Sequence, residues 1–204
     1  ENPACYYMHA SCCRLNLAYH LFRHGISDSS EIERLKDYLR WGILLLTPKC
    51  PGEYDKMCKA LPDGEYRNMG KIRLLPPIGD HANLGQPVPE YYLLMSKLYE
   101  KKDPEFANLL KWAYFEGGCD GSKRSQYPAL LSSITAEEMR KLPLPVELKS
   151  RRLEGFGAIF RGKFGTEDES YLLFKMGPGG YRYHRTEGSI LLFEDGKPII
   201  YDGG

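Results

Sequence analysis

The residues best suited to chemistry lie in the segment Gly177–Gly204, which reads GPGGYRYHRTEGSILLFEDGKPIIYDGG. Four ionisable residues occur there within six positions, behind a glycine-proline turn: Arg182, His184, Arg185 and Glu187. Because alternate side chains of an extended segment share a face, Arg182 and His184 are expected on the same side. Arg presents a planar fork to a carboxylate, and His exchanges a proton near neutral pH. The pattern favours a groove for an anionic ligand, although ordinary polar residues on a solvated sheet face would read alike.

An apolar hairpin follows these polar residues and is expected to hold them in place. Asp195-Gly196 stands between the apolar runs 190–193 and 198–201. An Asp-Gly pair between two such runs is the strongest short-range signal for a hairpin turn. The sequence therefore predicts two paired antiparallel strands, with the ionisable residues at their mouth.

Helical patterns recur in the chain before residue 142, on either side of an irregular stretch over 49–77 that is rich in Gly and Pro. Apolar residues recur at three- and four-residue steps from 3 to 24, and Gly25 ends that helix. Ser30 and Glu33 form a capping box for a second helix, which Thr47-Pro48 ends. Further helices are predicted over 89–101, over 104–117 and, briefly, after Thr135.

From residue 142 the pattern changes to strands. Pro143 and Pro145 interrupt the helical pattern. Strand-like runs then cover 155–160, 171–176, 189–193 and 198–201. Helices followed by strands predict an α-then-β chain with two domains, a helical one over 1–145 and a strand-rich one over 146–204.

Composition and charge exclude two classes of partner. The 204 residues are 42% hydrophobic and 27% charged, with a formal net charge of +1, which is ordinary for a soluble chain. Without an overall basic excess, the chain has no electrostatic footprint for nucleic acid. No apolar run approaches the ~20 residues that a membrane-spanning helix needs. The 15 tyrosines suit sugar binding, but many are expected to be plain core or rim residues.

The six cysteines point to no particular compartment. They are spread along the chain without a Cys-x-x-Cys pair, so a zinc ribbon is not expected. Cys5 and Cys12 share a helical face with apolar neighbours, which favours buried free thiols. Disulfides stay open as an alternative.

Four short motifs follow one another in the strand-rich part: 171–178 (YLLFKMGP), 189–193, Gly196-Lys197-Pro198 and Tyr201-Asp202-Gly203. Their order and spacing resemble the start of the β-sandwich domain in heparinase II/III-like polysaccharide lyases. The resemblance implies an incomplete α/α toroid over 1–145, followed by the first strands of an antiparallel β-sandwich. It also implies a fragment or processed piece, with the remaining helices and strands supplied by the parent chain.

The reaction implied by this resemblance is β-elimination on a polysaccharide that contains uronic acid, such as a glycosaminoglycan. A cation or hydrogen-bond donor must hold the uronate carboxylate, so that the C5 proton becomes more acidic. A base must take that proton, and an acid must protonate the departing glycosidic oxygen. The expected partner is an acidic polysaccharide substrate, and the reaction requires no cofactor.

One catalytic residue is expected at the start of the chain. In the run Glu1-Asn2-Pro3-Ala4-Cys5-Tyr6, Glu1 and Tyr6 keep the spacing of the family's Glu-x-x-Pro-x-Tyr, and Pro3 stands one position early. In the family this motif places the catalytic Tyr at the start of a toroid helix. Tyr6, or Tyr7 if the register shifts by one, is therefore the expected acid/base. A free Tyr has a pKa of about 10, so a neighbouring cation would have to lower it. Both tyrosines read equally well as rim aromatics at a helix start.

The strand-side half of the site departs from the family pattern. Where the family often has His-x-His-x-Asp, this chain has Arg182, His184 and Thr186. Arg182 is therefore expected to bind the uronate carboxylate. His184 matches the second His, and either takes part in proton transfer or ligates a structural zinc ion with Asp202. Two ligands do not complete a zinc site, since three or four are needed.

Further substrate contacts are expected from Asp80, His81, Arg185 and Glu187. Asp80 and His81 end a Pro-Pro-Ile-Gly-Asp-His run that resembles a cleft-facing loop in part of the family. Asp after Gly is also a common turn residue. Glu187 either orients a neighbouring group or is a surface carboxylate.

Two other functions stay open. Toroids also host glycoside hydrolases, which need two carboxylates about 5 to 10 Å apart, and Asp80 and Glu116 would be the candidates. A non-catalytic glycan-binding or assembly protein is the other, because Arg182 replaces the usual His. Export to the periplasm or the exterior is expected from the nature of the substrate. The uronate cut, endo or exo action and the oligomeric state do not follow from the sequence.

Overall fold

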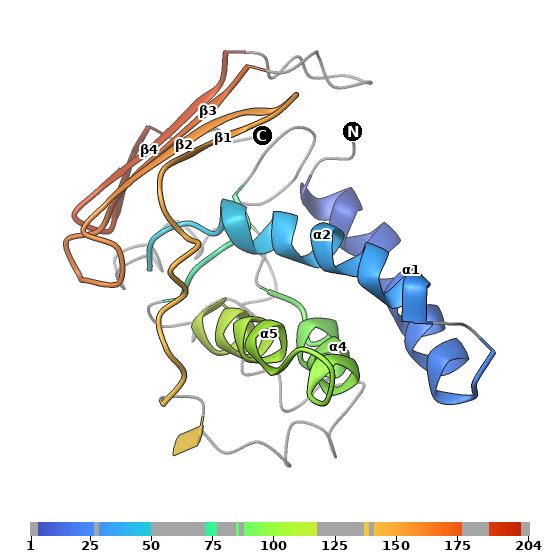
Figure 1. Cartoon of the computed structure of the whole chain (residues 1–204). Helices are drawn as coiled ribbons and strands as arrows, with labels where there is room; N and C mark the ends of the chain where they lie inside the picture. The colour runs from blue at the N-terminus through green and yellow to red at the C-terminus, as the bar shows by residue number, and fades with distance from the viewer. Residues whose placement is uncertain are drawn as a thin grey trace, which may run out of the picture.

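The computed structural model describes residues 4–26, 29–49, 72–76, 85, 88–117, 137–138, 141–176 and 188–200. Within these ranges the side chains of 4–12 and 29–32 are not described. Helices come first along the chain, and an antiparallel sheet follows (Figure 1). The predicted α-then-β order is therefore confirmed.

Four helices make up the first part of the described chain. Their bounds are α1 Ala4–Arg23, α2 Ser29–Leu45, α4 Tyr91–Tyr99 and α5 Pro104–Gly117. Each lies on a predicted helix and differs from it by one or two residues at an end, as helix boundaries commonly do. Figure 1 shows α4 and α5 side by side, with α2 running past them toward the sheet. None of the described helices is long and apolar enough to cross a membrane.

The start of α5 confirms the predicted cap. The Asp103 carboxylate accepts a hydrogen bond of 3.0 Å from the backbone N–H of Phe106, and Pro104 is the first helical residue. Lys36 of α2 donates to the other oxygen of the same carboxylate at 2.9 Å. These two contacts lower the pKa of Asp103, the backbone bond having the larger effect. The cap therefore also ties α2 to α5.

A buried apolar cluster joins the helices. Trp112 is almost fully buried in it. Leu148, which follows the helices in the chain, packs into the same cluster. Of the short fifth helix expected after Thr135, only residues 137–138 are described, and both are helical.

The sheet is a five-stranded antiparallel meander in the order β1-β2-β3-β4-β5. The strands are β1 Arg151–Leu153, β2 Gly157–Gly162, β3 Ser170–Lys175, β4 Ile190–Glu194 and β5 Lys197–Ile200. Four of them match predicted strands. The sequence did not predict β1, because three residues with two adjacent arginines carry no apolar alternation.

The predicted Asp-Gly hairpin is confirmed between β4 and β5. Glu194 pairs with Lys197, which leaves Asp195 and Gly196 as the two turn residues. Their φ angles are 48° and 67°, the left-handed values that a type I′ turn requires at both positions.

Both faces of the sheet are apolar. The inner face, which packs on the helical layer, buries Ile159, Tyr171, Leu173, Leu191 and Phe193 against Leu45 and Leu74. On the outer face, paired residues form a row of Phe160, Leu172, Leu192 and Ile200. Phe160 is 53% exposed and Ile200 is 47% exposed, so this second apolar face is only partly covered.

Candidate functional site

The sequence-predicted site residues all lie outside the side chains that the structure describes. Tyr6 and Tyr7 fall in the first turns of α1, where the backbone alone is described. The others lie outside the described residues altogether: Asp80, His81, Arg182, His184, Arg185, Glu187 and Asp202. The residues on either side of segment 177–187 are described.

Backbone hydrogen bonds fix where segment 177–187 leaves and rejoins the sheet. The N–H of Gly188 donates to the carbonyl of Lys175 at 2.8 Å, and the N–H of Lys175 donates to Ser189 at 3.0 Å. The N–H of Met176 donates to Phe156, in the β1–β2 turn, at 2.9 Å. We call this end of the sheet, formed by residues 154–156, 175–176 and 188–190, the open end.

A buried cation lies on the inner face at the open end. The inner-face alternation of β3 runs from Tyr171 through Leu173 to Lys175, which is only 5% exposed. Nearby, Phe156 of the β1–β2 turn meets Trp41 of α2 edge-on, with ring centroids 5.4 Å apart. The open end is therefore anchored on α2 and buries a lysine on the inner face of the sheet.

The opposite end of the sheet holds a buried ion network. This turn end is formed by the β2–β3 turn, 163–169, and the β4–β5 turn. Arg73 donates two hydrogen bonds, of 3.1 and 2.7 Å, to the Glu169 carboxylate. Arg161 donates a third hydrogen bond, of 3.1 Å, to the same carboxylate. The three side chains, which we call the interface cluster, are each 1–2% exposed.

The interface cluster also caps the carboxyl-terminal end of α2. Arg161 donates to the carbonyl of Leu44 at 3.0 Å and to that of Leu46, and the Tyr171 hydroxyl donates to Leu45 at 3.0 Å. Arg73 donates to the carbonyl of Thr47 at 3.0 Å. α2 has no basic residue in its own last turn. Cations from other elements therefore satisfy the negative end of this helix.

Burial sets the charge states in this cluster. Burial lowers the pKa of Arg161 and Arg73 lowers it further, while Tyr171 and Glu169 raise it, and a guanidinium stays protonated in proteins. Burial raises the pKa of Tyr171, so its hydroxyl stays a neutral donor. The Arg161 guanidinium lies 4.7 Å from the centre of the Tyr171 ring, and that of Arg73 lies 5.0 Å from the Phe164 ring. Arginine fixed in this way holds structure and exchanges no proton.

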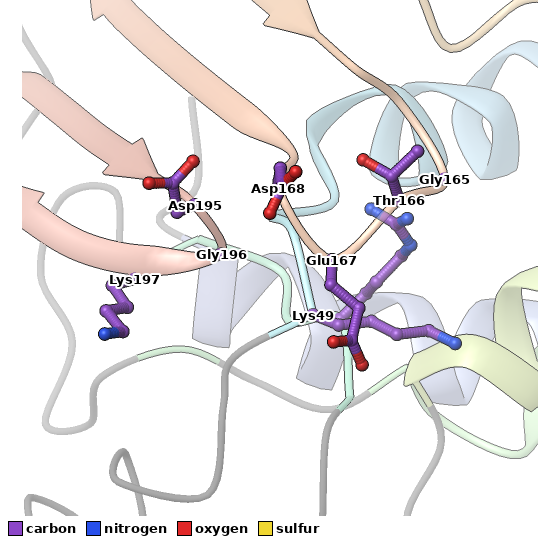
Figure 2. A pocket seen from close by; sticks show the side chains of 9 residues that line it. Lys49, Gly165, Thr166, Glu167, Asp168, Asp195, Gly196 and Lys197 are labelled. Atoms are coloured by element: carbon purple, nitrogen blue, oxygen red, sulfur yellow. The ribbon is translucent and has the colours of Figure 1, made fainter.

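A cavity of about 460 Å³ opens at the turn end. It is lined by Lys49, Arg73, Gly165, Thr166, Glu167, Asp168, Asp195, Gly196 and Lys197. Figure 2 shows Lys49 and Lys197 pointing to opposite sides of this cavity rather than toward one another. The cavity therefore mixes both signs of charge, with its two lysines pointing apart.

Glu116, a candidate of the hydrolase alternative, is engaged in ion pairs beside this cavity. Lys49 lies 2.9 Å and Arg73 3.4 Å from its carboxylate oxygens. The side chain is 11% exposed. Its proposed companion Asp80 lies outside the described residues. The contacts that are described thus give Glu116 a structural partner set.

The part of the chain that the structure describes contains no group of three or more His, Cys, Asp or Glu residues able to hold a metal ion. His184 and Asp202 lie outside that part.

No protein-family model matches the chain, and no curated protein or solved structure shows significant similarity to it.

The sequence reasoning missed the interface cluster. A signal for two of its members was available, since Arg161 continues the inner-face alternation from Ile159, and Glu169 precedes Tyr171 and Leu173 on the same face. Charged residues on an otherwise apolar face call for buried partners. The identity of Arg73 as the partner depends on contact across 96 residues, for which the sequence carries no pattern.

Proposed function

We propose that the chain is part of a polysaccharide lyase that cleaves uronic-acid-containing polysaccharides by β-elimination. One observation carries the proposal. Segment 177–187, which contains Arg182 and His184, starts and ends at the open end of the sheet, beside the buried cation of Lys175. An arginine and a histidine presented together at one end of a sheet suit the recognition of a uronate carboxylate.

The course of the helices supports the second half of this site. Figure 1 shows α1 starting nearer the sheet than it ends, and its first turns include positions 6 and 7. The open end is anchored on the same layer through Phe156 and Trp41. A tyrosine from α1 and a histidine from segment 177–187 would then approach the substrate from two sides.

The proposed chemistry assigns one role to each group. Arg182 binds the uronate carboxylate as a bidentate partner, which makes the C5 proton more acidic. Tyr6, or Tyr7, exchanges a proton with the substrate, and His184 takes part in the transfer. Asp80, His81, Arg185 and Glu187 contact the remaining sugar groups. Elimination needs no cofactor. In the alternative role of His184, it ligates a structural zinc ion with Asp202 and takes no part in the proton transfer.

The outer face of the sheet supports the finer assignment of the fold. A sheet that is apolar on both faces is typical of one buried between two layers. We therefore propose that a second sheet covers Phe160, Ile190 and Ile200, as in a β-sandwich, and that the helices belong to an α/α toroid. The parent chain would supply the missing strands and helices, and the acidic substrate favours a secreted or periplasmic location.

Product analysis of the intact parent protein tests the function. It is incubated with heparan, chondroitin, hyaluronan, alginate and pectic glycans, and the products are measured by mass spectrometry. Unsaturated oligosaccharides are expected, because elimination leaves a double bond and adds no water. Saturated products would show hydrolysis instead of elimination. Binding without products would indicate a glycan-binding protein.

Two variants test the residue assignment. Tyr6→Phe and His184→Ala are each expected to lower elimination by at least 100-fold, because each removes a proton-transfer group. Tyr7→Phe is the matched control for the register of the helix. Circular dichroism would check that the variants stay folded. Full activity in both Tyr6→Phe and His184→Ala would refute the assignment.

A further inference from the structure

The carboxyl-terminal end of α2 is completed by side chains from other parts of the chain. Four consecutive carbonyls, from Leu44 to Thr47, accept hydrogen bonds from Arg161, Tyr171 and Arg73. Glu169 binds both arginines and also accepts a hydrogen bond of 3.2 Å from the backbone N–H of Gly165. The end of α2, residues 72–76 and the turn end of the sheet therefore share one network.

Directional bonds of this kind fix an orientation more strictly than apolar contacts do. Leu45 and Leu74 also join the layers, but apolar side chains of this type tolerate small rotations and slides. A bidentate arginine-carboxylate pair has a defined plane and distance. Arg161 connects Glu169 to the carbonyls of Leu44 and Leu46 at the end of α2, so a rotation of the sheet would strain several hydrogen bonds at once.

We propose that Arg161 is a positioning residue. Together with Glu169 and Arg73, it aligns the two halves of the proposed lyase site. This role rests on the proposed function. The six residues of β3 separate the interface cluster from the open end by about 20 Å. Over that length, a rotation of about 3° moves the open end by about 1 Å, a misplacement that can cost about 100-fold in rate.

The experiment uses the intact parent protein with Arg161→Met, Arg161→Lys and the control Arg152→Met. Met keeps the length and apolar stem of the side chain without its donors, and Lys retains the charge with fewer directed bonds. Arg152 is an exposed arginine of β1, outside the interface cluster. Elimination is measured as separate kcat and KM values over a range of pH, below the unfolding temperature of each variant. Hydrogen exchange of the amides at the end of α2 is followed in parallel.

Arg161→Met is expected to lower kcat by about 10- to 100-fold. KM should change less than about threefold and the pH profile should keep its shape, because the binding and proton-transfer groups are unaltered. Arg161→Lys should recover part of kcat. Exchange should be faster at the end of α2 in the Met variant, and Arg152→Met should match the unaltered protein in every measurement.

A merely structural role gives a different result. Faster exchange with an unaltered kcat in Arg161→Met would overturn the positioning role while leaving the lyase proposal intact. A shifted pH profile would also overturn it, since the residue would then act on proton transfer. If Arg161→Met does not fold, the kcat of Arg161→Lys is the test. A lowered kcat supports the positioning role, and an unaltered kcat overturns it. The absence of elimination in the unaltered protein would sink the proposed function and the positioning role with it.

Discussion

Charge is buried differently at the two ends of the sheet's inner face. At the turn end, Arg161 binds the Glu169 carboxylate and two carbonyls at the end of α2, those of Leu44 and Leu46. At the open end, Lys175 is equally inward but lies where segment 177–187 joins the sheet. A buried cation stabilises nearby anions and lowers the pKa of acidic groups around it. In the proposed function, Lys175 would add positive charge beside the segment that binds the uronate carboxylate.

Replacement of this lysine should alter the acid-base behaviour of the parent protein. Lys175→Met is expected to reduce kcat/KM for elimination by 10-fold or more. If the proposed tyrosine base faces this cation, loss of the cation raises the pKa of the tyrosine, and the pH at which activity rises should move upward. The measurement is a pH-rate profile. Lys197→Met, at the turn end and exposed, is the matched control, and identical profiles for the two variants would contradict the assignment.

At the scale of elements, the β4–β5 hairpin turn is held close to two other segments. A Cβ at Gly196 would lie 3.1 Å from the Glu167 carbonyl oxygen and 3.2 Å from that of Lys49. The backbone N–H of Gly196 also donates to the carbonyl of Glu169 at 3.0 Å. The turn therefore needs glycine both for its positive φ and for this close approach.

A pair of glycine variants separates these two requirements. Gly25 has nearly the same φ, 69° against 67°, but a Cβ there would meet open space. Gly25→Ala is expected to cost about 1 kcal/mol from backbone strain alone. Gly196→Ala should cost more, because two carbonyls must also move. Urea unfolding of both variants gives the two losses in free energy of unfolding. Equal losses would mean that the close approach adds no cost to the substitution.

Local patterns predicted the elements well and the contacts between them poorly. The helices and four strands followed from periodicity, caps and the Asp195-Gly196 turn, all of which depend on neighbours in sequence. β1 has no strand pattern of its own and becomes a strand through its pairing with β2. Arg73 meets Glu169 across 96 residues, and no local rule chooses that partner. The predicted site residues lie outside the described side chains, so their assignment stays a prediction.

At the scale of the whole molecule, the helical layer and the sheet share their cores. Leu45 and Leu74, from the helical side, belong to the apolar cluster of the sheet. Phe164, from the β2–β3 turn, packs on the cluster of the helices and meets Trp112 with ring centroids 6.2 Å apart. With the interface cluster between them, the layers are coupled by both apolar and polar contacts.

This coupling predicts cooperative unfolding despite the change from helices to strands near residue 146. In urea, the tryptophan fluorescence of Trp41 and Trp112 and the exchange of β3 amides should report the same midpoint. Arg161→Met should lower that midpoint for both signals. Unfolding of the sheet at a clearly lower urea concentration than the helices would show two independent units.

The cap of α2 has a consequence for the order of events during synthesis. Arg161 lies 117 residues after Leu44, and Tyr171 lies 126 residues after Leu45, so the helix end is translated long before its donors. At about 5 to 20 residues per second, the delay is on the order of 6 to 25 seconds. During that time, water or a chaperone must satisfy the carbonyls at the end of α2. The last turn of this helix would therefore become ordered only when the sheet arrives, and closing so long a loop makes that step a slow one in folding.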